Sequence, residues 1–316
     1  MTHYITFPGL FDDILTVPTE TFFGIKIYAV MIMVGFLLAA LYAMARAKQF
    51  NADGDIVADI LIFALPAAII GARAYYVIHK WDYYSQHTDE IIKVWNGGIA
   101  IYGAIIAAAL VIVIYSKIKK VDMLSLLDLG AISLLIGQSI GRWGNFFNAE
   151  AYGTTTDLPW GMVIRKSIQT TGAAVHPTFL YESLWNAIGF IILHNYSKKR
   201  KFKGEMTLLY IAWYGLGRAF IEGLRIDSLM IGNTNIRVSQ VLAAVTCALA
   251  VVALLYLYKT KKGIPAFAVE GIVNVEEIEN SESAEENATE ETAEVICETE
   301  EAEEETEEET ETEVQP

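Results

Sequence analysis

The segment GRWGNFFNAEAYG, residues 141–153, ends a long apolar run and decides how the rest of the sequence is interpreted. It places one arginine, two amides and one carboxylate, Arg142, Asn145, Asn148 and Glu150, at the mouth of an expected membrane helix. A charge in hydrocarbon costs about 3 kcal/mol on insertion scales, so such residues normally face partners, water or a ligand. We therefore interpret this segment as a binding site.

Composition places the chain among integral membrane proteins. Of its 316 residues 53% are hydrophobic, and the mean hydropathy is +0.36, which is too apolar for an ordinary soluble domain of this size. The formal net charge of -15 comes from one end, because 21 of the 38 acidic residues lie in residues 270–316. Residues 1–269 hold 23 basic and 17 acidic residues, so this part of the chain is only mildly basic. We expect no nucleic-acid partner.

Seven segments are long and apolar enough to span a membrane, which takes about 20 residues. They predict an all-α integral membrane protein, a seven-transmembrane helix bundle over residues 1–262. The fourth segment is interrupted by Asp128, and its Gly137 and Gly141 match the small-xxx-small pattern that lets helices approach closely. The predicted spans are residues 22–45, 56–79, 96–116, 123–142, 178–196, 205–224 and 238–258.

Basic residues predict the orientation of the bundle. The links after spans one, three, five and seven hold thirteen Lys and Arg residues, against none in the first 20 residues. The positive-inside rule then places the N-terminus outside and the C-terminus in the cytoplasm. Residues 143–177 become an extracytoplasmic loop or cap. Residues 263–316, rich in Glu, Thr and Ala, are predicted to form a disordered acidic cytoplasmic tail.

On this map residues of six spans fall at one depth, in the outer half of the membrane, as an outward-facing pocket requires. Guanidinium groups bind phosphate bidentately and stay charged when partly desolvated, and a phospholipid phosphate sits at this depth. Plainer interpretations remain open, because Arg218 and Glu222 can neutralise each other at i, i+4 and Arg73 can pair structurally. The set comprises Tyr28, Arg73, Gly97, Gly98, Tyr102, Arg142, Tyr181, Glu182, Arg218 and Glu222.

Other kinds of site find no support in the sequence. The five histidines are scattered without metal-ligand spacing, so we expect no metal site. Neither a serine nucleophile motif nor a glycine-rich nucleotide loop is present. Cys247 and Cys297 are too few and too poorly placed for a disulfide framework.

The segment at 141–153 resembles the signature of the prolipoprotein diacylglyceryl transferases, bacterial enzymes that start lipoprotein maturation. The resemblance covers residues 20–258 and leaves out the tail. Four further segments carry it in order: IKIYAVMIMVGF at 25–36, WNGGIAIYG at 95–103, HPTFLYES at 176–183 and YGLGRAFIEGLR at 214–225.

The resemblance implies a reaction between two membrane substrates. A diacylglyceryl group passes from phosphatidylglycerol to the thiol of the lipobox cysteine in a preprolipoprotein signal peptide, which forms a thioether and releases glycerol phosphate. The expected location is the bacterial cytoplasmic membrane. No cofactor is implied, because the donor lipid carries its own leaving group.

The resemblance also assigns roles to residues. Arg142 is expected to bind the phosphate, and together with Arg218 to stabilise the charge that develops on it. Many members have histidine where this chain has Tyr102, and a phenol with a reference pKa near 10 is a poor base at pH 7, so the base that deprotonates the thiol is left open. Catalytic candidates are Arg142, Arg218, Glu150, Glu222 and Tyr102, and substrate-binding candidates are Arg142, Asn145, Asn148, Gly153, Tyr28 and Tyr214.

Two other classes of protein remain open from the residues alone. A secondary transporter could bind an anionic solute with the same arginines, although transporters tend to contain inverted repeats and these seven segments show no clear duplication. A structural or signalling bundle could recruit a cytoplasmic partner through its acidic tail. That reading leaves the outer polar cluster unexplained.

Overall fold

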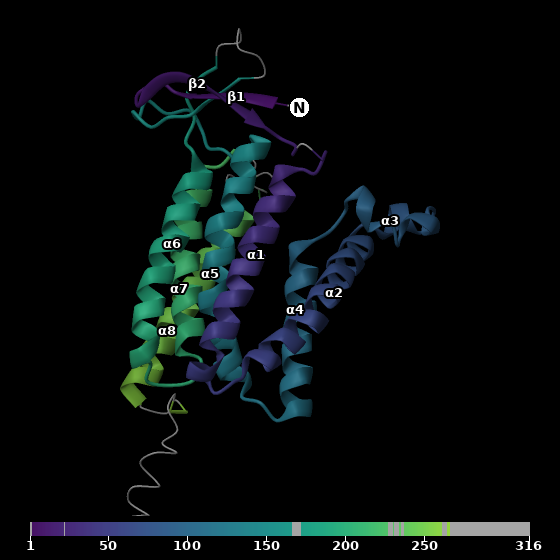
Figure 1. Ribbon diagram of the computed structural model, residues 1–316, viewed down its shortest axis with the longest axis vertical. Helices are drawn as coiled ribbons and strands as arrows, with labels where there is room; N and C mark the ends of the chain where they lie inside the picture. Colours follow the sequence, from purple (N-terminus) through teal and green to yellow (C-terminus); the bar gives the residue numbers. More distant parts are fainter. Residues whose placement is uncertain are drawn as a thin grey trace, which may run out of the picture. The chain divides into compact units, whose positions relative to one another are not determined.

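The computed structural model describes residues 2–21, 23–165, 172–226, 230, 234, 237–260 and 264–265, and these residues are mostly helical (Figure 1). A helix stands at each of the seven predicted segments. Five of them, α1, α2, α4, α5 and α8, are long and apolar enough to cross a membrane, whereas α6 and α7 carry more polar residues. The helices are α1 (Ile27–Arg46), α2 (Gly54–His79), α3 (Trp81–Tyr84), α4 (Ile101–Lys119), α5 (Met123–Asn148), α6 (Thr178–Tyr196), α7 (Glu205–Glu222) and α8 (Val238–Thr260).

The expectation of an all-α protein is wrong in one respect, because the described residues include a three-stranded antiparallel sheet. Its order is β2-β1-β3, with β1 at Thr2–Phe7, β2 at Phe11–Pro18 and β3 at Val163–Arg165. Ile5, which is fully buried, packs with Phe179 at the start of α6 and with other apolar residues of this region. The sheet therefore rests on the helix ends that carry the 141–153 segment.

The loop expected at residues 143–177 starts later than predicted. Helix α5 continues to Asn148 and ends at Ala149, which has a left-handed φ of 50°. The polar residues Arg142, Asn145 and Asn148 therefore share one helical face at spacings of three residues, because a helix makes one turn in 3.6 residues. Most of the 141–153 segment is thus rigid helix rather than loop.

Glycines let several helices pack backbone to backbone. Gly137 on α5 faces Gly35 on α1, where a Cβ added to Gly35 would lie 3.0 Å from the Gly137 carbonyl oxygen. The predicted packing role of Gly137 is confirmed, whereas a Cβ on Gly141 would meet open space. Gly71 and Gly103 make a similar close contact between α2 and α4. In Figure 1 these two helices run together, while α1, α5, α6, α7 and α8 stand side by side.

Helices α6 and α7 are joined by a reciprocal contact of two tryptophans and two glycines, which we call the Trp–Gly clasp. The indoles of Trp185 and Trp213 stack at 4.4 Å, and each donates its Nε1 hydrogen to the other's backbone carbonyl, at 2.9 and 3.0 Å. Each indole also lies over a glycine of the opposite helix, Gly217 and Gly189 respectively. The clasp fixes the separation of the two helices, and α6 and α7 carry most of the site described below.

We expect Gly217→Ala to destabilise the protein. The new Cβ would lie 2.2 Å from Trp185 Nε1, so the stacked indoles would have to separate. Overpacking of this kind costs about 1–3 kcal/mol, which lowers the melting temperature by several degrees. Thermal unfolding in detergent measures the change, with Gly130→Ala as the control because its Cβ meets nothing within 4 Å. Equal melting temperatures for the two variants would contradict the importance of the clasp.

A buried carboxylate on α5 caps the start of α7, at the end of the bundle away from the sheet. Asp128 on α5 is fully buried, and its oxygens accept hydrogen bonds from the backbone of Gly204, at 2.8 Å, and from Thr207. Gly204 precedes α7 and lacks a side-chain cap of its own, so Asp128 satisfies the free N–H groups at this helix start. Asp128 is therefore structural. The tail predicted over residues 263–316 lies outside the described residues, apart from residues 264–265.

Candidate functional site

Three arginines from three parts of the chain meet at one carboxylate. Glu182 on α6 is 4% exposed, and its Oε2 lies 2.5 Å from Arg142 Nη2 on α5. Its Oε1 lies 2.9 Å from Arg218 Nη1 on α7 and 3.3 Å from Arg225 Nη1, just after α7. Arg218 Nη2 pairs in turn with Glu222, at 2.6 Å. We call these five residues the arginine cluster.

The arginine cluster carries more positive than negative charge. It combines three guanidinium groups with two carboxylates, and both carboxylates are more deeply buried than the arginines. The side chains of Arg142 and Arg218 are 23% and 17% exposed, so part of each guanidinium stays accessible. Each guanidinium has five N–H donors, of which the carboxylates use only some. The cluster is therefore suited to an anion, and a phosphate is the anion that paired arginines bind best.

A second chain of hydrogen bonds runs from Arg142 along α5. Arg142 Nη1 donates to Asn145 Oδ1 at 3.4 Å, and Asn145 Nδ2 donates to Glu150 Oε1 at 3.0 Å. Asn148 Nδ2 donates to the same Glu150 oxygen at 3.3 Å. Four of the predicted site residues thus form one connected group, and Glu150 orients Arg142 through an amide rather than by direct contact.

Tyr28 and Gly153 pack beside this group. The Tyr28 ring lies against Gly144, where an added Cβ would be 2.8 Å from the ring, so α1 and α5 approach closely beside Arg142. The backbone of Gly153 pairs with Arg225, and its N–H donates to the carbonyl of His176 at 2.9 Å. Gly153 thus ties the loop after α5 to the segments that begin α6 and follow α7.

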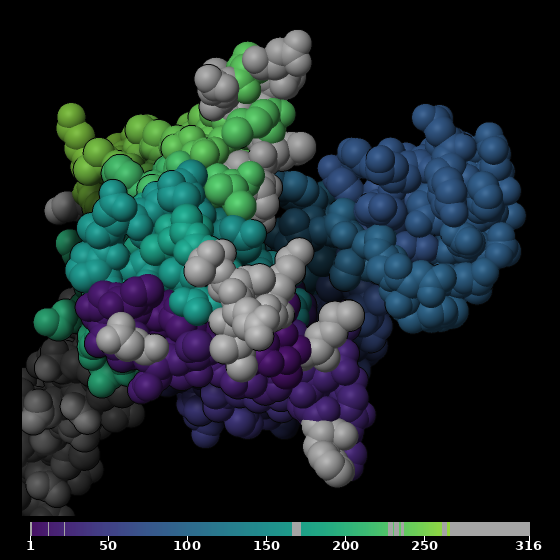
Figure 2. All heavy atoms as spheres, turned by 90° about the horizontal axis from the view of Figure 1, so that it is seen from above, coloured from purple at the N-terminus to yellow at the C-terminus, as the bar shows by residue number. Residues whose placement is uncertain are grey.

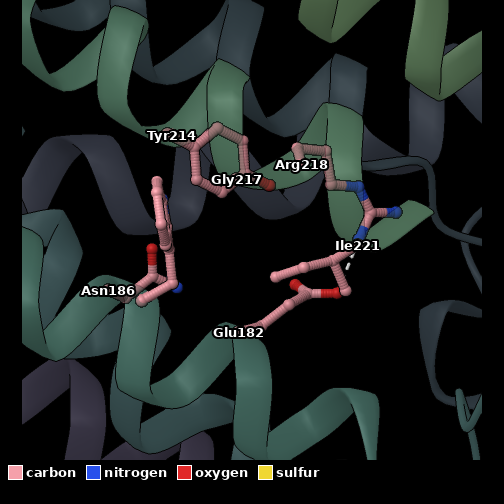
Figure 3. A pocket seen from close by; sticks show the side chains of 7 residues that line it. Glu182, Asn186, Tyr214, Gly217, Arg218 and Ile221 are labelled. Atoms are coloured by element: carbon pink, nitrogen blue, oxygen red, sulfur yellow. Dashed lines mark hydrogen bonds and ion pairs between the residues drawn. The ribbon is translucent and has the colours of Figure 1, made fainter. Parts of the chain in front are cut away.

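A pocket between α6 and α7 adjoins the arginine cluster. It is half open to solvent, and its free interior, about 10 Å³, has room for a group of about the size of one water molecule. Figure 3 shows Glu182, Tyr214 and Arg218 pointing toward this space from the two helices. The ring of Tyr214 stacks on that of Tyr210, with 5.8 Å between the ring centroids. The hydroxyl of Tyr210 accepts a hydrogen bond from Gln138. The lining residues are Glu182, Trp185, Asn186, Tyr214, Gly217, Arg218 and Ile221.

The structure does not bring the predicted outer-half residues Arg73, Gly97, Gly98 and Tyr102 to the cluster. Arg73 is buried and donates to four backbone carbonyls between Glu90 and Gly98, at 2.7–2.8 Å, so it holds the link between α2 and α4. Tyr102, at the start of α4, is 46% exposed and lies with its ring 6.4 Å from that of Tyr75. In Figure 2 this link, which includes α3, gathers at one side of the viewed face.

Two members of the cluster were given no role in the sequence analysis. Glu182 is one of the predicted outer-half residues but has no assigned partner there, and Arg225 is only part of a matched segment. The signal for Glu182 is a carboxylate inside an otherwise apolar segment, which needs a partner. The partner arginines lie 36 and more residues away, beyond any local spacing rule. Among the described residues no group of three or more His, Cys, Asp or Glu is placed to hold a metal ion.

Comparison with known proteins identifies the family. The family described as "Prolipoprotein diacylglyceryl transferase" matches residues 17–256. Proteins named phosphatidylglycerol–prolipoprotein diacylglyceryl transferase are similar to the chain. The relative from Listeria innocua is 46% identical over 253 residues, covering 78% of this chain and 90% of its own. Those from Finegoldia magna and Streptococcus pneumoniae are 46% and 44% identical and cover 77% and 78% of this chain, and 94% of their own in each case. The chain therefore belongs to the prolipoprotein diacylglyceryl transferase family.

Proposed function

We propose that this protein transfers the diacylglyceryl group of phosphatidylglycerol to the lipobox cysteine of preprolipoproteins. The observation that carries the proposal is the convergence of Arg142 and Arg218 on opposite oxygens of the buried Glu182, beside a pocket. Two guanidinium groups held in this way can bind one phosphate between them without rearranging their carboxylate anchor. Family membership supplies the identity of the lipid and of the acceptor.

The chemistry requires one substitution at carbon. The cysteine thiolate attacks the glyceryl carbon that bears the phosphate, a C–S bond forms, and the C–O bond breaks with its electron pair leaving on glycerol phosphate. Negative charge grows on the leaving phosphate as the bond breaks. Arg142 and Arg218 stabilise that charge, and preorganised donors of this kind are usually the largest catalytic contribution. Asn145, Asn148 and Glu150 orient Arg142, while Glu222 orients Arg218.

We further propose a seven-span topology in the bacterial cytoplasmic membrane, with the N-terminus outside and the acidic tail, residues 263–316, in the cytoplasm. Helices α6 and α7, with 19 and 18 residues, are long enough to span as well, and the site residues Glu182, Arg218 and Glu222 account for their more polar composition. The cluster lies at the end of α7 opposite its basic flank at residues 198–203, as an outward-facing site requires. The loop after α5, together with the sheet, forms an extracytoplasmic cap.

Purified protein in detergent tests the proposed reaction. We expect incubation with phosphatidylglycerol and a lipobox peptide to raise the peptide mass by one diacylglyceryl unit, and to release glycerol phosphate in equal amount. A peptide with serine in place of the lipobox cysteine is the control. Release of glycerol phosphate without any peptide product would indicate a lipid hydrolase instead.

The role of Tyr102 is tested by Tyr102→Phe. Its ring is 46% exposed and contacts Tyr75 on α2, and among the described residues no contact joins it to the arginine cluster. We therefore expect a modest loss of rate, about threefold, consistent with a hydrogen bond to substrate. Loss of a general base costs about a hundredfold or more, so a fall of that size would identify the phenol as the base. Tyr75→Phe, which removes the hydroxyl of the neighbouring ring, is the matched control.

A further inference from the structure

Asn186 holds a buried oxygen that no part of the described chain uses. The residue lies on α6, is 2% exposed and lines the pocket beside the arginine cluster. Its Oδ1 has no hydrogen-bond partner. A buried polar atom left unsatisfied costs about 1–3 kcal/mol, and native proteins rarely retain one without a reason. The mechanism above makes no use of this side chain.

Asn186 lies about one helical turn further along α6 than Glu182, the carboxylate of the arginine cluster. It follows Glu182 by four residues on α6, just as Tyr214 precedes Arg218 by four residues on α7. Four residues of helix rise about 6 Å. The pocket therefore begins at the guanidinium of Arg218 and extends about one turn deeper, between an amide on one helix and a phenol on the other.

The walls of this pocket are rigid and of mixed polarity. The Trp–Gly clasp contributes Trp185 and Gly217 to its lining, so the separation of α6 and α7 is fixed where Asn186 stands. A group bound there must be small, close to the phosphate and able to donate a hydrogen bond. A hydrocarbon chain would leave the Asn186 oxygen unsatisfied.

We propose that Asn186 accepts a hydrogen bond from a hydroxyl of the headgroup glycerol of phosphatidylglycerol, and so selects this lipid. The proposal rests on the proposed function. The headgroup glycerol is the part of the donor that stays with the phosphate when the C–O bond breaks. Its hydroxyls lie within about one helical turn of the phosphorus, which matches the step along α6 from Glu182, the partner of Arg218, to Asn186. Tyr214 faces the same space from α7 and is the second polar contact.

The test compares two donor lipids. Phosphatidyl-1-propanol has the same three headgroup carbons as phosphatidylglycerol but lacks both hydroxyls. We expect the wild-type protein to lipidate a lipobox peptide with kcat/KM about tenfold or more higher for phosphatidylglycerol, because a site built for a hydroxyl rejects the analogue without it. Asn186→Leu, which has a similar volume, should bring the ratio close to one by slowing only the phosphatidylglycerol reaction. Asn195→Leu, on the exposed face of the same helix, should keep the wild-type ratio.

The outcomes separate this proposal from the one it rests on. If Asn186→Leu slows both lipids equally and the ratio is unchanged, Asn186 has only a structural role and the proposal is overturned. Asn186→Ala removes the acceptor without adding bulk, so it should lower the ratio in the same direction even if the leucine variant does not fold. If the wild-type protein uses neither lipid, the proposed function itself fails, and the inference fails with it.

Discussion

We expect Arg142→Ala to lower the rate of lipobox-peptide lipidation by about a thousandfold or more. Arg142 is the member of the arginine cluster that joins Glu182 to the Asn145–Glu150 hydrogen bonds. Its loss would remove one of the two charges proposed to stabilise the leaving phosphate, together with the contacts to Glu182 and Asn145. Arg142→Lys keeps the charge but loses the bidentate geometry, so it should fall between the wild-type protein and the alanine variant.

The expected loss is specific to chemistry at the cluster. The variant should still insert into membranes and purify as a folded protein, because Arg142 lies at the end of α5 and is partly exposed. Lys26→Ala is a suitable control, since Lys26 is an exposed basic residue just before α1. A near-normal rate for Arg142→Ala, with the inserted amount unchanged, would remove Arg142 from the mechanism.

Glu182→Gln should impair both stability and activity. Three guanidinium groups share this buried carboxylate, and its neutralisation leaves them close together with only Glu222 as a carboxylate partner in the cluster. Removing one partner from a buried ion pair costs about 3–5 kcal/mol of stability. The arginines also lose the anchor that holds them in position for the phosphate, so we expect the rate to fall about a hundredfold or more.

Two measurements check the Glu182 prediction. Thermal unfolding in detergent reports stability, and the peptide mass assay reports rate at a temperature where the variant is folded. Glu20→Gln, at an exposed position before α1, controls for the loss of a carboxylate. A stable variant with the wild-type rate would show that the ion pairs at Glu182 are dispensable, and would contradict its role as the anchor of the arginines.

The helices could be predicted from the sequence because the length and hydropathy of an apolar run are local properties. The sheet could not be predicted in the same way. Its central strand, Thr2–Phe7, pairs with β3 at Val163–Arg165, far along the chain, and a window of about 20 residues averages away a strand of six. The β-branched and aromatic residues of Thr2–Phe7 are the signal that a shorter window would have found.

The sequence predicts that the candidate site residues share one depth in the membrane, but it predicts few of the contacts between them. The i, i+4 spacing of Arg218 and Glu222 indicated that these two residues can pair, because both lie on one helix. The role of Glu182 depends on how α5, α6 and α7 pack, which sequence spacing does not contain. The same limit applies to Arg73. Its sequence position is compatible with a site residue, but its guanidinium donates to backbone carbonyls, which only the folded structure reveals.

The central claim is that the guanidinium groups of Arg142 and Arg218 hold the phosphate of the donor lipid. An experimental structure of the protein with bound phosphatidylglycerol tests it most directly. We predict that phosphate oxygens lie about 3 Å from nitrogens of both arginines, with the headgroup glycerol directed toward Asn186. A phosphate bound elsewhere, with Arg142 and Arg218 paired only to Glu182 and Glu222, would contradict the claim.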